Sequence, residues 1–432
     1  MKTDRNLAGA EPAALAVLVT LAAGLIVIPA VFSSGLDTFR LPKELVFRAE
    51  AITLLMLAVF WATSRRRTWT FAMRPEFLVT AAVVGWTVIT TVTSTNRLLS
   101  TDSLITVVAA AVIFIATCLA AQRVTLIAVD VLMLTGCVNA LLVILQELKI
   151  WTQLPPSPDT ATHYGSVGLL GNTNDAGTYL VTLAVAAIVL AVTAQGARRW
   201  VYAAVGLLLV AGIAASGTRT ALGALLAALI VFAVGHSRRA ALTVGAIVVA
   251  LMLVVLSPAT SMGRGIRTLA DAVAHRDYQH LFSERLPPFL AAADMTRDHL
   301  LLGVGPGCFK YHYMAYRVRL GERYPGAWIR GFSMNWGEAH NDHLQTAAET
   351  GLPGYALFLA AIGTGTGIVG ARKKAIAPTP EAAFALALRW PLATAVLIIC
   401  LAQFPLELAA PRLVILTLGA LCVTWSRDDG PL

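Results

Sequence analysis

Two histidines, an asparagine, a glutamine and three acids gather in residues 337–354, GEAHNDHLQTAAETGLPG. The spacing predicts a short helix that ends at Gly351, with Pro353 early in the next membrane helix. His340 then lies in the first turn, where the helix dipole disfavours imidazolium and leaves a neutral imidazole able to accept a proton. His343, one turn deeper, is placed to pack or to orient its neighbour. The plainer alternative is an interfacial histidine that only satisfies hydrogen bonds at the headgroups.

Arginine at the edge of an apolar run is the second chemical signal. Arg219, in SGTRTALG, lies between Thr218 and Thr220 at the start of such a run. A charge costs about 2.5–3.5 kcal/mol at the bilayer centre and less near the interface, so it usually pairs with something or serves a site. The guanidinium fork matches phosphate oxygens, which predicts an anion site. The alternative is an arginine that snorkels to the headgroups.

Other candidates are less specific. Arg285, in SERLPPFL, opens the first helical segment expected in a long loop, and Lys43, in LPKE, lies at the mouth of an apolar run. Each is either an anion ligand or part of a basic surface that faces anionic lipid. Asn172 and Asn174, in GLLGNTNDAG, either orient sugar hydroxyls or cap a helix, and capping is the commoner use of asparagine there.

Composition predicts the elements that position these residues. Of the 432 residues 57% are hydrophobic and 13% charged, and the mean hydropathy is +0.72, which indicates an integral membrane protein. Crossing a hydrocarbon core takes about 20 apolar residues as a helix. Such runs predict an all-α chain with about twelve transmembrane helices, near residues 12–32, 44–62, 75–93, 103–121, 124–146, 175–194, 200–216, 219–235, 240–257, 353–370, 383–401 and 407–424.

Basic residues predict the orientation, because positively charged loops stay in the cytoplasm. They alternate consistently when both termini are placed inside, and the first run lacks a cleavage site and is expected to be retained. The basic positions used are Lys2, Arg5, Arg65, Arg66, Arg67, Arg123, Arg198, Arg199, Arg238, Arg239, Arg372, Lys373, Lys374 and Arg427. The candidate residues then all face the outside.

The predicted organisation has three parts. Residues 1–257 form the first nine spans, residues 258–337 a large outward loop, and residues 338–432 the motif helix and the last three spans. Within the loop, residues 283–303 and 309–322 each predict a short helix.

Two classes of partner are not expected. The net charge of +9 is largely explained by topology, and no aromatic-basic motif accompanies it, so nucleic acid is not a predicted partner. The five cysteines are scattered and lack metal-ligand spacing, and no outward acidic pair is placed to hold a divalent ion. No metal or cofactor is predicted.

Taken together, these stretches resemble the O-antigen ligase and polymerase superfamily of bacterial envelopes, over roughly residues 160–360. The ligase signature is His followed by Asn, Ser or Gln, nine residues, and Gly-x-x-Gly; His340-Asn341 and Gly351 to Gly354 meet it. Thr218-Arg219-Thr220 is similar to the family's element that opens a span. Arg285 matches the arginine that opens the large loop, and GVGPGCF, residues 303–309, is similar to that loop's glycine-rich segment.

The resemblance implies a lipid-dependent glycosyltransferase of GT-C type in the bacterial inner membrane, with its site facing the periplasm. Such enzymes move a glycan from undecaprenyl pyrophosphate to an acceptor hydroxyl, here expected to be lipid A-core oligosaccharide, without a metal. His340 would accept the hydroxyl proton while Arg219 and Arg285 neutralise the leaving group, with inversion at the anomeric carbon. Substrate contacts are expected from Lys43, Asn172, Asn174, Thr218, Thr220, Asn341 and His343.

Three alternatives stay open. A polysaccharide polymerase or a protein O-oligosaccharyltransferase of the same superfamily would share the chemistry and differ in the acceptor. A secondary transporter would suit twelve spans equally well. The collection of polar residues on one side and the absence of a recognisable internal repeat favour an outward-facing enzyme.

Overall fold

The computed structural model describes residues 12–33, 38–65, 74–121, 126–151, 165–236, 242, 244–246, 249, 257, 260–277, 281–282, 285–324, 336–369 and 379–426. Most of the basic residues behind the predicted orientation lie outside these ranges, namely Lys2, Arg5, Arg66, Arg67, Arg123, Arg238, Arg239, Arg372, Lys373, Lys374 and Arg427. Most of the predicted ninth span, residues 240–257, lies outside them too.

Within the described ranges the regular structure is helical, which confirms an all-α membrane protein. Six helices are long and apolar enough to cross a membrane: α3 (Pro75–Val92), α4 (Arg97–Ala120), α5 (Ile127–Glu147), α6 (Thr173–Thr193), α7 (Arg198–Ser216) and α16 (Pro380–Ile399). Five more coincide with predicted spans: α1 (Pro12–Ala30), α2 (Arg40–Arg65), α8 (Arg219–Gly235), α15 (Asp342–Gly365) and α17 (Ala409–Trp425). Twelve spans stay a prediction.

Helix α6 is the centre of one half of the bundle. It contacts α5, α7, α8, α16 and α17, and almost all of its side chains are buried. Small residues let its neighbours approach: a Cβ added at Gly212 of α7 would lie 2.8 Å from the Ala140 Cβ of α5. Such close approach replaces the hydrophobic driving force that lipid does not provide.

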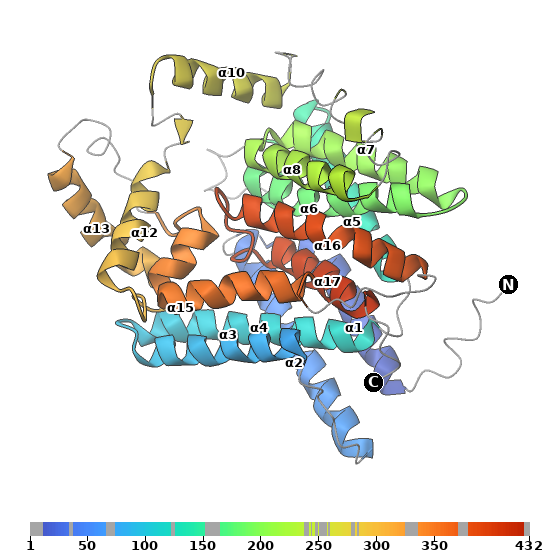
Figure 1. The fold of residues 1–432 in the computed structure, drawn as a ribbon, viewed down its shortest axis with the longest axis horizontal. Helices are drawn as coiled ribbons and strands as arrows, with labels where there is room; N and C mark the ends of the chain where they lie inside the picture. The colour runs from blue at the N-terminus through green and yellow to red at the C-terminus, as the bar shows by residue number, and fades with distance from the viewer. Residues whose placement is uncertain are drawn as a thin grey trace.

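Helix α15 joins the other half of the bundle to the large insertion. It packs against α3 along its length and against α12 (Leu286–Asp298) at its N-terminal end, and α3 in turn packs against α4 (Figure 1). Helices α10 (Ser261–Ala274), α12 and α13 (Phe309–Arg323) lie at the left of this view, at one end of the long helices. The candidate residues at the start of α15 are therefore next to the insertion.

The insertion has its own small core. Helices α12 and α13 confirm the two predicted there, and their buried faces meet through residues that include Ala291, Met295, Phe309 and Tyr313. Helix α10 was not predicted, although Thr260 caps it by accepting from the Gly263 amide at 3.0 Å. The prediction that Arg285 opens the first helical segment of the loop is therefore wrong, because α10 comes before it.

Gly351, the first glycine of the signature, is required where the backbone of α15 passes close to the backbone of the insertion. Gly351 has φ of +72° inside α15 and marks a kink, and a Cβ there would lie 2.2 Å from the Leu301 carbonyl oxygen. Beside it, the Leu352 amide donates to the Leu300 oxygen at 2.8 Å and the Val304 amide to the Ala348 oxygen at 2.9 Å. The Gly-x-x-Gly element thus docks α15 onto the glycine-rich segment of the insertion.

We expect Gly351→Ala to destabilise the protein by about 1–3 kcal/mol, because alanine is strained at this φ and its Cβ meets backbone. Gly223→Ala in α8 is the matched control, since nothing lies within 4 Å of its added Cβ and its φ is ordinary. Thermal unfolding of the purified protein measures both. Equal midpoints for the two variants would contradict this role for Gly351.

Candidate active site

His340 lies just before α15, and its predicted place in the first turn is wrong. The helix begins at Asp342 because Asn341 caps it: the Asn341 Oδ1 accepts from the Leu344 amide at 2.9 Å. The Asn341 Nδ2 also donates to the Leu401 carbonyl at 2.8 Å, which ties the cap to the segment after α16. His340 is left with φ of +55°, an uncommon conformation for a non-glycine residue and one found at sites that hold strain.

The His340 ring is held by aromatic edges. Trp336 and Phe404 lie at centroid distances of 4.9 and 4.7 Å, and both contacts are edge-on. The His340 Nδ1 is buried and has no hydrogen-bond partner among the described residues. Unpaired buried polar atoms are rare in folded proteins, so this nitrogen is a candidate to meet a group from a substrate.

The pKa of His340 is lowered to about 3, first by burial and then by the positive charges of Arg285 and Arg40. The ring is neutral, as the sequence predicts, but the cause is different: burial and the two arginines lower the pKa, and not the dipole of α15. At neutral pH the ring is uncharged, so one of its nitrogens can accept a proton or a hydrogen bond while the other donates one.

Arg285 and Arg219 come together from separate helices. Arg285 is the N-cap residue of α12 and donates to the Ala402 carbonyl, and Arg219 is the first residue of α8 and donates to the Gly265 carbonyl of α10 at 3.3 Å. Burial lowers the pKa of Arg285 to about 10, with a further contribution from Arg219 that Asp175 opposes. Two neighbouring cations at helix starts form a favourable place for an anion.

The starts of α6 and α8 are joined next to these arginines. Thr218, which is buried, donates from Oγ1 to the Thr173 carbonyl at 2.8 Å. Asn172 caps α6 by accepting from the Asn174 amide at 2.8 Å, so the capping interpretation is confirmed for Asn172. Asn174 and Thr220 are half-buried beside them.

Arg40 is a site residue that the sequence did not single out. Its Nε lies 3.7 Å from the Asp175 Oδ2 and its NH1 3.3 Å from the Glu338 Oε1, and its guanidinium is 5.0 Å from the centroid of the Phe404 ring that contacts His340. The residue begins α2, and the only sequence signal was its place in a polar loop before an apolar run. Lys43, one turn on, is buried and donates to the Val31 carbonyl.

His343 is engaged on both ring nitrogens. Its Nε2 lies 2.9 Å from the Leu397 carbonyl, which can only accept, so this nitrogen carries the hydrogen, and the Nδ1 accepts from the Tyr355 hydroxyl at 3.2 Å. The residue lies in the first turn of α15, not one turn deeper as predicted, because the helix begins five residues later than expected. These contacts fix α15 to α16.

Residues 204–359 match a family model described as O-antigen ligase. The match includes Arg219, Arg285, His340 and Gly351, and it confirms the resemblance to the O-antigen ligase superfamily over these residues. No curated protein matches the chain. Arg40, Lys43 and Asn172 lie outside the matched residues.

The lowered pKa of His340 predicts an unusual pH dependence of its reactivity. With a folded pKa near 3, the neutral ring persists down to pH 5, whereas free histidine with a pKa of about 6.5 loses roughly 30-fold of its neutral form between pH 7.5 and 5. Carbethoxylation of His340, followed by mass spectrometry and normalised to N-acetylhistidine in the same tube, measures this. A parallel fall in both rates would contradict the burial and charge argument.

Proposed function

We propose that the chain is a glycosyltransferase that moves a glycan from undecaprenyl pyrophosphate to an acceptor hydroxyl, with lipid A-core oligosaccharide as the acceptor. One observation carries the proposal: three separated motif residues influence one another electrostatically. Burial is the main cause of the lowered pKa of both Arg285 and His340. Arg219 lowers that of Arg285 further, and Arg285 that of His340, although the three residues come from α8, α12 and the segment before α15. The family match supports a glycan-transferring enzyme of this kind.

The proposed reaction is a single displacement. The acceptor oxygen attacks the anomeric carbon, the bond from that carbon to the pyrophosphate oxygen breaks, and its electron pair leaves with the pyrophosphate. Arg219 and Arg285 stabilise the negative charge that develops there. His340 takes the hydroxyl proton, an effect typically worth 10²–10⁴-fold, and the configuration at carbon inverts.

A pKa near 3 makes His340 a poor base when the site is empty, and the donor itself corrects this. Burial is the largest cause of the low pKa of His340, and the charges of Arg285 and Arg40 are the other two. A pyrophosphate bound between the arginines offsets those charges and raises the basicity of the ring, because an opposite charge nearby favours the protonated form. Base strength is then coupled to the presence of the donor, which limits proton transfer in its absence.

The remaining predicted residues take different proposed parts. Asn341 positions His340 by capping α15 and holding the Leu401 carbonyl. Thr218 and Asn172 build the joined starts of α8 and α6, and Asn174 and Thr220 are the half-buried residues there that we assign to donor contacts. Lys43 interacts electrostatically with Asp175, and we assign to it a contribution of positive charge to the donor site.

We place the protein in the bacterial inner membrane with twelve spans, the loop of residues 258–337 in the periplasm, and the three-part organisation predicted from the sequence. The common position of α10, α12 and α13 and of the candidate residues at one end of the long helices supports this (Figure 1). A GT-C-type site that faces the periplasm would meet both lipid-linked substrates without a nucleotide sugar.

His340→Ala should abolish transfer from lipid-linked glycan to acceptor in a purified assay, while donor binding survives because both arginines are intact. His343→Ala should reduce turnover only modestly, since it loosens the contact of α15 with α16. His275→Ala is the control, because that side chain is exposed in α10's C-terminal cap and should leave turnover unchanged. Wild-type turnover in His340→Ala would remove the proposed base.

Arg219→Lys and Arg285→Lys should each weaken binding of inorganic pyrophosphate by about 10- to 100-fold, since lysine keeps the charge but loses the fork and a charge-assisted hydrogen bond is worth about 1.5–3 kcal/mol. Arg297→Lys, an exposed position on the same helix as Arg285, is the matched control. Isothermal titration measures the affinities. Unchanged binding in both site variants would locate the anion elsewhere.

The acceptor separates the ligase from the other transferases of the superfamily. Supplying lipid A-core, lipid-linked glycan alone, or a serine-containing acceptor protein to the same purified enzyme distinguishes the three reactions. Transfer to lipid A-core is the expected product, and chain extension on the lipid carrier would instead identify a polymerase.

A further inference from the structure

Three consecutive leucines, Leu300, Leu301 and Leu302, form the turn that follows α12, and their side chains point away from the protein. They are 50%, 71% and 37% exposed, and among the described residues they are not part of the core of the insertion. Single exposed leucines are normal on a protein surface, whereas a contiguous apolar patch marks a contact site. These residues, which we call the leucine turn, are therefore a candidate contact surface.

The backbone of the leucine turn is partly hydrogen-bonded inside the protein. The Gly303 amide donates to the His299 carbonyl at 3.0 Å, which closes the turn, and the Leu300 carbonyl accepts from the Leu352 amide at 2.8 Å. Irregular backbone is tolerated near lipid only where its polar groups are satisfied by the protein or by water. These bonds lower the cost of bringing the turn into apolar surroundings at the membrane boundary, where water is still present.

The position of the leucine turn along the bundle is fixed by α15 and α3. Leu300 bonds to Leu352, next to the start of the span predicted from residue 353. The Trp86 Nε1 donates to the Thr350 carbonyl at 2.8 Å, and Trp86 lies about 9 Å along the axis before the end of α3. Helix α3 is long and apolar enough to cross a membrane. The leucine turn therefore lies beside the last turns of a membrane helix, and not beyond its end.

The surface next to the leucine turn is apolar as well. Leu352 is 48% exposed, and the last turns of α3 expose Val88, Ile89 and Val92. Trp86, which is half-buried between them and α15, is of the residue type enriched at membrane boundaries. Because lipid covers the exposed apolar side chains of a membrane helix, the continuity of this surface indicates lipid as the partner of the leucine turn.

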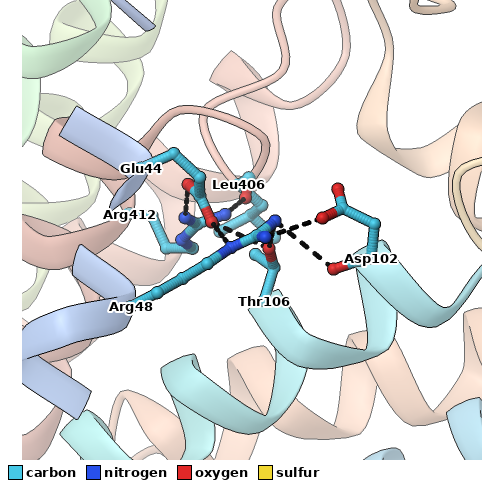
Figure 2. A network of polar contacts seen from close by, with 6 residues as sticks. All are labelled: Glu44, Arg48, Asp102, Thr106, Leu406 and Arg412. Atoms are coloured by element: carbon cyan, nitrogen blue, oxygen red, sulfur yellow. Dashed lines mark hydrogen bonds and ion pairs between the residues drawn. The ribbon is translucent and has the colours of Figure 1, made fainter. Parts of the chain in front are cut away.

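The helices that support the leucine turn are held in a fixed relation. Helix α3 packs against α4, and a charged network ties α4 to α2 and α17 (Figure 2). Arg48 of α2 donates to the Asp102 Oδ1 at 2.6 Å and to the Thr106 hydroxyl of the same helix, α4, at 2.7 Å. Glu44 of α2 pairs with Arg412 of α17. The depth of the leucine turn is thus set by the bundle and not by α12 alone.

We infer that the leucine turn is a membrane contact of the insertion, in which Leu300, Leu301 and Leu302 enter the boundary between headgroups and acyl chains and are covered by phospholipid. Apolar side chains of surface-bound segments bury themselves at this boundary. The inference does not depend on the proposed glycosyl transfer, because it rests on the position and exposure of the turn. It bears on the site because α12 runs from Arg285 at its N-cap to the leucine turn, so the lipid contact holds Arg285 at a fixed height.

The test places a fluorescent label on the leucine turn and determines which medium quenches it. Leu301→Cys is made in a Cys137→Ala background, because the other four cysteines are buried, and is labelled with bimane in phosphatidylcholine nanodiscs. The Cys137→Ala protein alone measures residual labelling. Phosphatidylcholine brominated near the carbonyl end of its acyl chains should reduce the emission by about half, because the label lies at the headgroup boundary. Iodide in the water should have little effect.

Glu322→Cys in the same background is the matched control. Glu322 is exposed and lies about 20 Å along α13 from Phe309, whose amide bonds to the Glu349 carboxylate of α15. Iodide should quench this label about fivefold more than the label at Leu301, since charged quenchers stay in water. Leu300→Cys is a second position on the turn and should behave as Leu301→Cys does, which keeps the test decisive if one label disturbs the fold.

Two results would overturn the inference. Iodide quenching at Leu300 and Leu301 that equals the quenching at Glu322 would place the leucine turn in water. Quenching by neither iodide nor brominated lipid would show that protein covers the turn, either a second copy of the chain or another segment of the same copy.

Discussion

The constraint on which the candidate site depends is the burial of the Arg285 guanidinium near a second arginine, Arg219. Burial lowers the pKa of Arg285, and the positive charge of Arg219 lowers it further. Carbonyl oxygens of Gly265 and Ala402 and the nearby Asp175 offset part of this effect. A polyanion bound here would offset the rest, because an opposite charge nearby favours the charged form of an arginine.

The segment between α16 and α17 contacts the candidate site from two sides, at Arg285 and at the start of α15. Its Leu401 carbonyl accepts from Asn341 and its Ala402 carbonyl from Arg285, and the Phe404 ring packs on His340. The proposed base, His340, and one proposed phosphate ligand, Arg285, thus both contact one short stretch of backbone, which lies beyond the residues that the family model covers. A displacement of this segment would move both groups together.

Much of the architecture is readable from the sequence, because lipid imposes apolar runs of fixed length and turns impose glycine and proline. The two insertion helices also follow from their start and stop signals. The predicted position of His340 is wrong because several residues before α15 can begin a helix. The contact of Asn341 with Leu401, next to that of the Asp342 amide with the Cys400 carbonyl, favours the cap that is used. Both contacts are tertiary and leave no local signal.

Arg40 and the cavity between α2, α3, α4, α15 and α17 could not be predicted from the sequence for the same reason. Arg40 is one of many basic residues near a helix start, and it gains significance only from Asp175 and Glu338, which lie far along the chain. The cavity needs five helices, none of which shows a cavity-forming pattern alone. Motif spacing predicted which residues to examine, whereas the charge balance around them required the folded chain.

The central claim is that a bound pyrophosphate raises the basicity of His340 by offsetting the charges of Arg285 and Arg40. The direct measurement is an NMR titration of ¹⁵N-histidine-labelled protein in lipid nanodiscs, with and without saturating undecaprenyl pyrophosphate, and with the His340 signal assigned from its loss in His340→Ala. The account predicts a ring that stays neutral to well below pH 5 in the free protein and a pKa that rises on binding. A pKa near 6.5 in the free protein, or one that the donor leaves unchanged, would contradict it.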